Sequence, residues 1–210
     1  MPHKIRSLTT FLIVTLFFTS YSKAQTFDCL SIDESNLAKK SFESFQEDLF
    51  TYYKFNNDTI KIYRKFLMEI ASLSIDLKKF PSAVSIQLAR DFKNKASDKK
   101  SIWVRLSDYE QDEATKKPSP YIPPAKGEKE EILTFNYRGG FIQCLKNTNA
   151  SEDFKKIIQT LEDDANVSTS LIAQKLFYMT DKEINTPQVK KFIAFDIYFS
   201  ILIVIEKAFG

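Results

Sequence analysis

Histidine is nearly absent from this sequence, and its scarcity excludes several kinds of catalytic site. The single histidine among 210 residues is His3, in a segment that we expect to be removed. Imidazole is the side chain whose unperturbed pKa allows proton exchange near neutral pH. Without it, a Ser-His-Asp triad, a Cys-His pair or a zinc site of the HExxH type cannot form. Paired carboxylates and a Ser-Lys pair stay open, and we predict no catalytic motif, metal site or cofactor.

The first 24 residues have the features of a cleavable export signal. Lys4 and Arg6 precede an apolar run over residues 8–18, and Ser22 and Ala24 are small residues at the −3 and −1 positions of a cleavage site. An uncleaved anchor needs about 20 apolar residues, and this run is shorter and contains threonines. We therefore predict an exported protein, periplasmic or secreted, formed by residues 25–210.

The excess of positive charge is confined to this signal segment. Its removal takes away Lys4, Arg6 and Lys23 but no acidic residue, so 30 basic residues become 27, equal to the 27 acidic ones. A neutral protein without a basic block has no electrostatic footprint for nucleic acid or anionic lipid. We expect no nucleic-acid partner.

Cysteine is also scarce, with Cys29 and Cys144 as the only two. An even number of cysteines in an exported protein favours a disulfide. On the chain-entropy model, a loop of this size stabilises a fold by about 4 to 5 kcal/mol. We predict that the two residues pair; two buried thiols are the alternative, because the sequence does not give the distance between them.

Glycine is rare, with four residues, and few segments alternate polar and apolar residues as half-buried strands do. We therefore predict an all-α fold, a single-domain helical bundle of about six to eight helices. Apolar residues at helical spacing predict helices over 33–54, from Thr59 to Leu77, over 98–114 and over 168–180. Two further helices are predicted from their start signals: one with Pro81 in its first turn, and one that opens with a capping box of Asn149 and Glu152.

Two segments interrupt this helical pattern. Residues 116–127, "KKPSPYIPPAKG", hold four of the seven prolines, and we predict a Pro-rich loop that acts as a linker. Residues 130–147, "EEILTFNYRGGFIQCLKN", fit either a helix or a hairpin that turns at Gly139 and Gly140. We favour the helix, although two internal glycines cost about 2 kcal/mol and need a reason such as a closely approaching neighbour.

The C-terminal segment "VKKFIAFDIYFSILIVIEKAFG" is the most apolar part of the predicted mature protein. Thr186 and Pro187 give a strong helix start, and only Asp196 and Ser200 are plainly polar between Lys191 and Glu206. These 14 residues are more typical of a buried helix than of a membrane span. We predict a hydrophobic central helix of the bundle, with a membrane-tethered helix as the alternative.

Asp196 interrupts this apolar helix, and a buried carboxylate must be paired, hydrogen bonded or protonated. One interpretation is a functional acid with a raised pKa. The interpretation we favour is a narrow polar stripe of Asp196, Ser200 and Lys207 that touches solvent or a lysine of a neighbouring helix.

Two classes of function fit these patterns. The first is an exported, non-catalytic helical protein that binds another protein, as an inhibitor or immunity protein does; its support is the chemistry excluded above and a content of 28 phenylalanines and tyrosines. The residues we name for partner contact are Trp103, Tyr109 and Tyr121. The second is an envelope-directed hydrolase using paired carboxylates, and a membrane-tethered form of either is the third possibility.

A short resemblance bears on the first class. Residues 141–158, with Cys144, Ser151 and Phe154, are similar to a segment of the small periplasmic immunity proteins of amidase toxins. The similarity covers less than a tenth of the chain and needs a gap, so it assigns no family. It implies only an expectation of protein binding.

Overall fold

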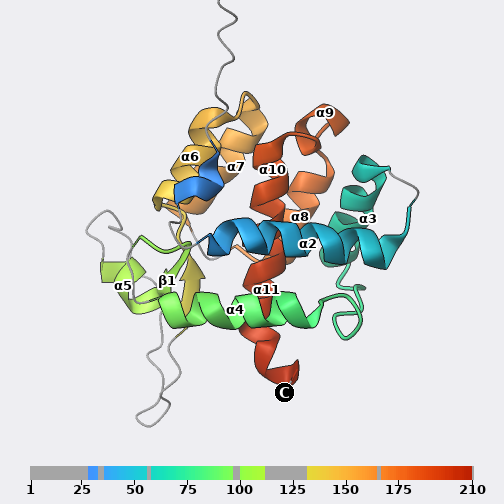
Figure 1. The fold of residues 1–210 in the computed structure, drawn as a ribbon. Helices are drawn as coiled ribbons and strands as arrows, with labels where there is room; N and C mark the ends of the chain where they lie inside the picture. The colour runs from blue at the N-terminus through green and yellow to red at the C-terminus, as the bar shows by residue number, and fades with distance from the viewer. Residues whose placement is uncertain are drawn as a thin grey trace, which may run out of the picture.

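The computed structural model describes residues 28–32, 36–55, 58–96, 100–111, 132–164 and 167–209. Over these ranges the chain forms an all-α bundle with one small two-stranded sheet (Figure 1). The predicted signal peptide, the Pro-rich loop at 116–127 and Tyr121 lie outside the described residues.

The described residues form ten α-helices, three other helical elements and two strands. The helices are α2 (Leu37–Tyr53), α3 (Thr59–Ala71), α4 (Ala83–Lys95), α5 (Leu106–Gln111), α6 (Gly140–Thr148), α7 (Glu152–Asp163), α8 (Thr169–Phe177), α9 (Asp181–Ile184), α10 (Pro187–Phe192) and α11 (Ser200–Ile205). Three further elements are the 3₁₀ turns η2 (Cys29–Ile32) and η4 (Glu206–Phe209) and the π-helical segment η3 (Ile193–Phe199). The strands are β1 (Trp103–Arg105) and β2 (Leu133–Phe135).

The C-terminal helix is the centre of the bundle, as predicted. α10, η3, α11 and η4 continue without a break, and Figure 1 shows this red rod crossing behind α2 and α4. All seven residues of η3 are buried, and η3 contacts both α2 and α8. Among the described helices, none combines the length and the apolar character that crossing a bilayer requires.

Local sequence explains where many helices begin. The Thr186 side chain accepts a hydrogen bond from the Val189 backbone N–H, and Pro187 occupies the first turn of α10, as predicted. Five other helices begin behind a side-chain cap, from Asp58, Ser82, Ser151, Ser168 and Thr180. These caps satisfy backbone donors that have no partner within the helix.

The predicted helix over 98–114 is wrong in its first half. Trp103–Arg105 form β1, which pairs antiparallel with β2 in the register Trp103 to Phe135, and of the described residues in this range only Leu106–Gln111 are helical. Backbone bonds extend the pairing on both sides, from Leu106 N–H to the Ile132 carbonyl and from Asn136 N–H to the Ile102 carbonyl. Strands of three residues are too short for a recognisable alternation of polar and apolar side chains.

The segment 130–147 contains a strand and then a helix, so neither alternative describes all of it. Gly139 is the residue before α6 and Gly140 its first residue, so the glycines open this helix and do not interrupt it. A Cβ atom on Gly139 would lie 2.7 Å from the Asn136 Nδ2 atom. The close neighbour is therefore a side chain of the preceding turn, and not another helix.

Three helix boundaries also differ from the prediction. Pro81 precedes the cap Ser82 and lies outside α4, and α3 ends at Ala71, before Leu77. Ser151, not Asn149, caps α7, because the Ser151 hydroxyl accepts a hydrogen bond from the Phe154 backbone N–H. The Asn149 side chain accepts one from the Ser151 backbone N–H, outside the helix. The helix predicted over 33–54 is present as α2 over Leu37–Tyr53, with Asn36 before it, and residues 33–35 lie outside the described residues.

The two cysteines are bonded, which confirms the predicted disulfide. Cys29 in η2 and Cys144 in α6 have sulfur atoms 2.00 Å apart and Cα atoms 5.6 Å apart. The bond connects the start of the described chain to a helix 115 residues later. It therefore closes a loop that contains α2, α3, α4 and the sheet.

Candidate functional site: the Asp196 pocket

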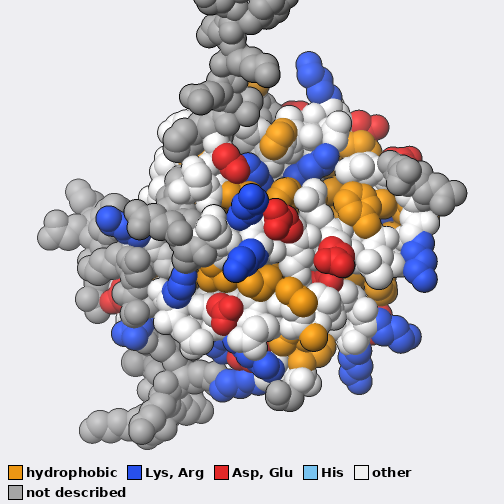
Figure 2. Space-filling model, in the orientation of Figure 1, with side chains coloured by type: hydrophobic (Ala, Val, Ile, Leu, Met, Phe, Trp, Pro, Cys, Tyr) orange, Lys and Arg blue, Asp and Glu red, His pale blue; other side chains and the backbone are white. Residues whose placement is uncertain are grey.

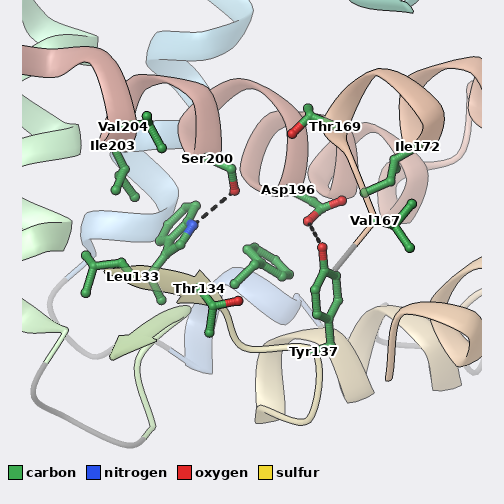
Figure 3. Close-up of a pocket in the computed structure, with 12 residues that line it drawn as sticks. Leu133, Thr134, Tyr137, Val167, Thr169, Ile172, Asp196, Ser200, Ile203 and Val204 are labelled. Carbon is green, nitrogen blue, oxygen red and sulfur yellow. Dashed lines mark hydrogen bonds between the residues drawn. The ribbon is translucent and has the colours of Figure 1, made fainter. Parts of the chain in front are cut away.

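A partly open pocket of about 170 Å³ lies between the sheet, α8 and the C-terminal helix (Figure 3). We call it the Asp196 pocket. Its apolar walls come from both strands and from both helices that face them. These walls include Leu133, Val167, Ile172, Ile203 and Val204.

Asp196 is the only charged residue among the described residues that line this pocket. Its side chain comes from the middle of η3 and is 2% exposed. The Tyr137 hydroxyl donates a hydrogen bond of 2.6 Å to Oδ1 of Asp196. The other oxygen, Oδ2, is buried and has no hydrogen-bond partner among the described residues. One oxygen of the carboxyl group is thus held by Tyr137, and the other is a buried acceptor that no described residue satisfies.

Burial raises the pKa of Asp196 to about 7, against an ordinary value of 3.8, although the Tyr137 hydrogen bond acts in the opposite direction. A carboxyl group with this pKa exists in both protonation states near neutral pH. Such perturbed groups in a cavity are typical of functional sites.

The favoured interpretation of Asp196 as part of a solvent-facing stripe is wrong. Its carboxyl group is bonded to a tyrosine from the segment before α6, and it reaches neither solvent nor a lysine. Ser200 also turns inward, where its Oγ atom accepts a hydrogen bond of 3.1 Å from Trp103 Nε1. Lys207 lies in the terminal turn η4, beyond α11, and does not line the pocket.

The π-helical geometry of η3 sets the direction of these side chains. Both the backbone N–H and the hydroxyl of Ser200 donate to the carbonyl oxygen of Phe195, five residues earlier. A π-helical turn is wider than an α-helical one, and such turns are frequent at functional sites. This wider turn sits in the middle of the central helix, where Asp196 meets Tyr137.

A second buried acid lies on another side of η3. Asp48 of α2 accepts hydrogen bonds through Oδ2 from the hydroxyl groups of Ser85 and Tyr198. The Ser44 hydroxyl contacts Ser85 at 2.6 Å and extends this network. Asp48 does not line the Asp196 pocket, so these two acids do not form a facing pair.

The predicted contact residues have buried or undescribed positions. Trp103 is 1% exposed and forms part of the pocket wall, next to Phe92 at a ring distance of 4.6 Å. Tyr109 is also buried, and the guanidinium group of Arg138 lies 4.2 Å from its ring centroid. A partner would therefore reach Trp103 only through the pocket.

Sequence reasoning missed Tyr137, Thr169 and Val204, which line the pocket together with Asp196. Tyr137 is 59 residues away from its acidic partner, and no local pattern connects the two. A useful signal was present only for Asp196 itself, as a lone acid in an apolar helix.

Within the described ranges, no group of three or more His, Cys, Asp or Glu side chains is arranged to hold a metal ion. What the pocket offers is one titratable carboxyl group, several hydroxyl groups and aliphatic walls. The chain matches no protein-family model, and no curated protein or solved structure is significantly similar to it.

Proposed function

We propose that this is an exported, non-catalytic helical protein that binds another protein through the surface around the Asp196 pocket. The observation that carries the proposal is the position of Val204, a pocket-lining residue of α11 that is 78% exposed. Val204 adjoins the apolar lining residues Leu133 and Ile203, and apolar surface that is grouped around a cavity is what a partner's anchoring side chain covers.

Other exposed apolar residues lack such a setting. Leu73 and Tyr178 are as exposed as Val204, but neither lines the pocket. On the face shown in Figure 2, the apolar side chains of the described residues emerge in small groups between charged ones. The Asp196 pocket is therefore the better docking candidate, because it combines exposed apolar atoms with a cavity.

The volume of the pocket favours a protein side chain as its occupant. Small-molecule sites commonly enclose about 300 to 1,000 Å³, whereas this pocket has about 170 Å³. Interfaces often depend on one anchoring side chain that fills a desolvated pocket. A partner inserting one side chain here would also cover Val204.

The Cys29–Cys144 disulfide supports the exported part of the proposal, because such bonds persist mainly outside the cytoplasm. An inhibitor or immunity protein that meets its target in the cell envelope would have this combination of a disulfide and a binding surface. The expected signal peptide fits the same compartment.

An envelope-directed hydrolase is the second candidate, and the pKa of Asp196 near 7 favours it, since a general acid needs such a value. Glycoside hydrolysis requires a second carboxylate about 5 to 10 Å away. The described lining of the pocket supplies one carboxylate. We therefore rank this candidate second.

The test recovers a partner with the wild-type protein and then compares how tightly two matched surface variants bind it. The tagged mature protein is exposed to the envelope fraction of the producing cell, and a stoichiometric partner is identified, purified and titrated. Val204→Lys should weaken its binding at least tenfold, because the variant places a charge on the covered rim. Val84→Lys should not, since Val84 is an exposed valine in the first turn of α4, outside the pocket lining.

Two results would reverse the ranking. One is equal binding by both variants, which would exclude the pocket rim from the interface. The other is absence of a partner combined with turnover of peptidoglycan or another glycan that Asp196→Asn abolishes, which would identify a hydrolase.

A further inference from the structure

We propose that the Asp196 pocket is a receptor for a positively charged nitrogen group, the ammonium of a lysine or the guanidinium of an arginine on the partner protein. This inference rests on the proposed function, because it names the side chain that enters the pocket. Its chemical basis is nevertheless separate and can be tested without the partner.

One oxygen of the Asp196 carboxyl group lacks a hydrogen-bond partner among the described residues. Tyr137 occupies Oδ1 and fixes the orientation of the carboxyl group, while Oδ2 is buried without a partner among the described residues. Figure 3 shows Oδ2 turned away from Tyr137, on the side of the pocket where Thr169 and Ile172 lie. An entering N–H group would find an acceptor there that is already aligned.

The described lining of the pocket holds one acid and no counter-ion for it. A buried acid without a counter-ion is unfavourable in its ionised form, and a cation of matching geometry removes this cost. No lysine or arginine is among the described lining residues. The cation that would balance Asp196 must therefore come from outside the described pocket.

The pocket lining combines hydroxyl groups with aliphatic surface. Hydroxyl groups of Thr134, Thr169 and Ser200 are distributed around the pocket and can accept the remaining N–H groups of an ammonium or guanidinium. Leu133 and Val167 offer aliphatic surface to a hydrocarbon stem. Lysine and arginine combine such a stem with a charged head group.

The affinity for a cation should rise with pH, because a cation binds the ionised carboxylate and disfavours its protonation. Tyr137 is the only other titratable group in the described lining, and burial raises its pKa far above the working range, so it stays a neutral donor. Tyr109 acts on Tyr137, and Asp48 is directed to Tyr198 on another side of η3. The pH dependence near neutrality therefore belongs to Asp196.

The experiment titrates the full mature protein with n-butylammonium and n-butylguanidinium, with n-butanol as the uncharged control, at pH 6 and pH 8. Binding is followed by NMR shifts of Tyr137 and Ile172. The charged probes should bind about tenfold more tightly at pH 8 than at pH 6, as expected for a group half ionised near pH 7. The uncharged probe should show no such difference.

Two variants keep this test decisive. Asp196→Asn should abolish both the preference for the charged probes and its pH dependence. If that variant does not fold, Val167→Trp, which fills the pocket without altering the acid, should block the probes, whereas Val84→Trp on the first turn of α4 should not. Equal binding of charged and uncharged probes, or charged-probe binding that persists in Asp196→Asn, would overturn the proposal.

The same measurements separate this inference from the proposed function. If a partner depends on Val204 but its affinity is unchanged by Asp196→Asn and by pH, the protein-binding function holds and the cation receptor is wrong. If the probes bind as expected but no partner depends on Val204, the pocket accepts cations and the protein-binding function is wrong.

Discussion

Asp196 and Tyr137 form the interaction on which the site depends at the scale of single residues. The tyrosine hydroxyl lies 2.6 Å from one carboxyl oxygen, and burial of the pair raises both pKa values. The two groups hold each other in place inside an apolar surrounding. Ionisation of Asp196 is therefore energetically unfavourable in the folded protein but not in the unfolded chain.

The stability of the protein should therefore depend on the protonation of Asp196. Its pKa is raised on folding from 3.8 to about 7, so its stabilising contribution is complete below pH 4 and is lost as the pH rises to about 7. The difference corresponds to about 4 kcal/mol. In Asp196→Asn this loss should disappear, as measured by urea unfolding from pH 4 to pH 8.

Asp153→Asn is the matched control, because Asp153 lies in α7 with an exposed side chain. The informative quantity is the difference in unfolding free energy between each variant and the wild type. A difference for Asp196→Asn that does not change between pH 4 and pH 7 would show that Asp196 has an ordinary pKa.

The C-terminal helix is the element that brings the buried polar groups together. Within η3, Asp196 points to Tyr137 in the pocket and Tyr198 points to Asp48 of α2, so one π-helical segment joins two polar contacts to different parts of the fold. At the end of the same rod, Glu206 bonds to Arg90 and Lys93 of α4. The helix is thus attached by directional bonds as well as by apolar packing.

Removing the hydroxyl group of Tyr198 should destabilise the protein. In Tyr198→Phe, Asp48 keeps its bond from Ser85 but loses the other donor in a buried position, at a cost of about 1 to 3 kcal/mol. Tyr178→Phe is the control, because Tyr178 is exposed. Equal urea midpoints for the two variants would mean that the Tyr198 bond adds nothing to stability.

The Glu206 contact gives a prediction with the opposite pH dependence. Burial acts to raise the pKa of Glu206, but the hydrogen bonds and charges of Lys93 and Arg90 outweigh burial and lower it. The contribution of Glu206 to the free energy of unfolding is therefore present above about pH 4.5, the ordinary pKa of a glutamate, and is lost as the pH falls. Glu206→Gln should cost about 1 to 3 kcal/mol at pH 7.

This penalty should shrink as the pH falls from 7 to 3, because protonation of Glu206 removes the charge that Arg90 and Lys93 contact. Glu152→Gln is the control, because the exposed pair of Glu152 and Lys155 on α7 should leave stability unchanged. Thermal melts at pH 7 and pH 3 measure both effects. A penalty of the same size at both pH values would contradict the assigned ion pairs.

The disulfide acts at the scale of the whole molecule. It links η2 to α6 across 115 positions, so its reduction restores conformational freedom to more than half of the unfolded chain. Reduction should cost about 4 to 5 kcal/mol on the chain-entropy model. Denaturant unfolding with and without reductant measures this cost.

The double variant Cys29→Ser, Cys144→Ser should be as unstable without reductant as the reduced wild-type protein is, and reductant should not change its unfolding midpoint. A wild-type protein whose unfolding midpoint is the same in both conditions would contradict a stabilising role of the bond.

The sequence predicted those parts of the fold whose pattern lies within one long continuous segment. The spacing of Leu37, Phe45 and Leu49 in α2 and the Thr186–Pro187 start of the final helix are complete within their own segments, and both were predicted correctly. The apolar character of residues 192–205 likewise sufficed to identify the central helix. The pairing of the cysteines followed from their number.

The features that the sequence did not predict depend on contacts between residues far apart in the chain. β1 and β2 have three residues each, and they pair across the fold in the register Trp103 to Phe135. The Asp196 pocket combines side chains from the sheet, α8 and the C-terminal helix, and its defining bond to Tyr137 joins residues 59 positions apart. A sequence pattern marks Asp196 as unusual but does not identify its partner.

The most direct test of this account is an NMR titration of the Asp196 carboxyl carbon in the mature protein, with and without n-butylammonium. The account predicts a pKa of about 7 for the free protein and a lower value with the amine, because the bound cation favours the ionised form. A pKa near 4 in the free protein, or a value that the amine does not change, would contradict it.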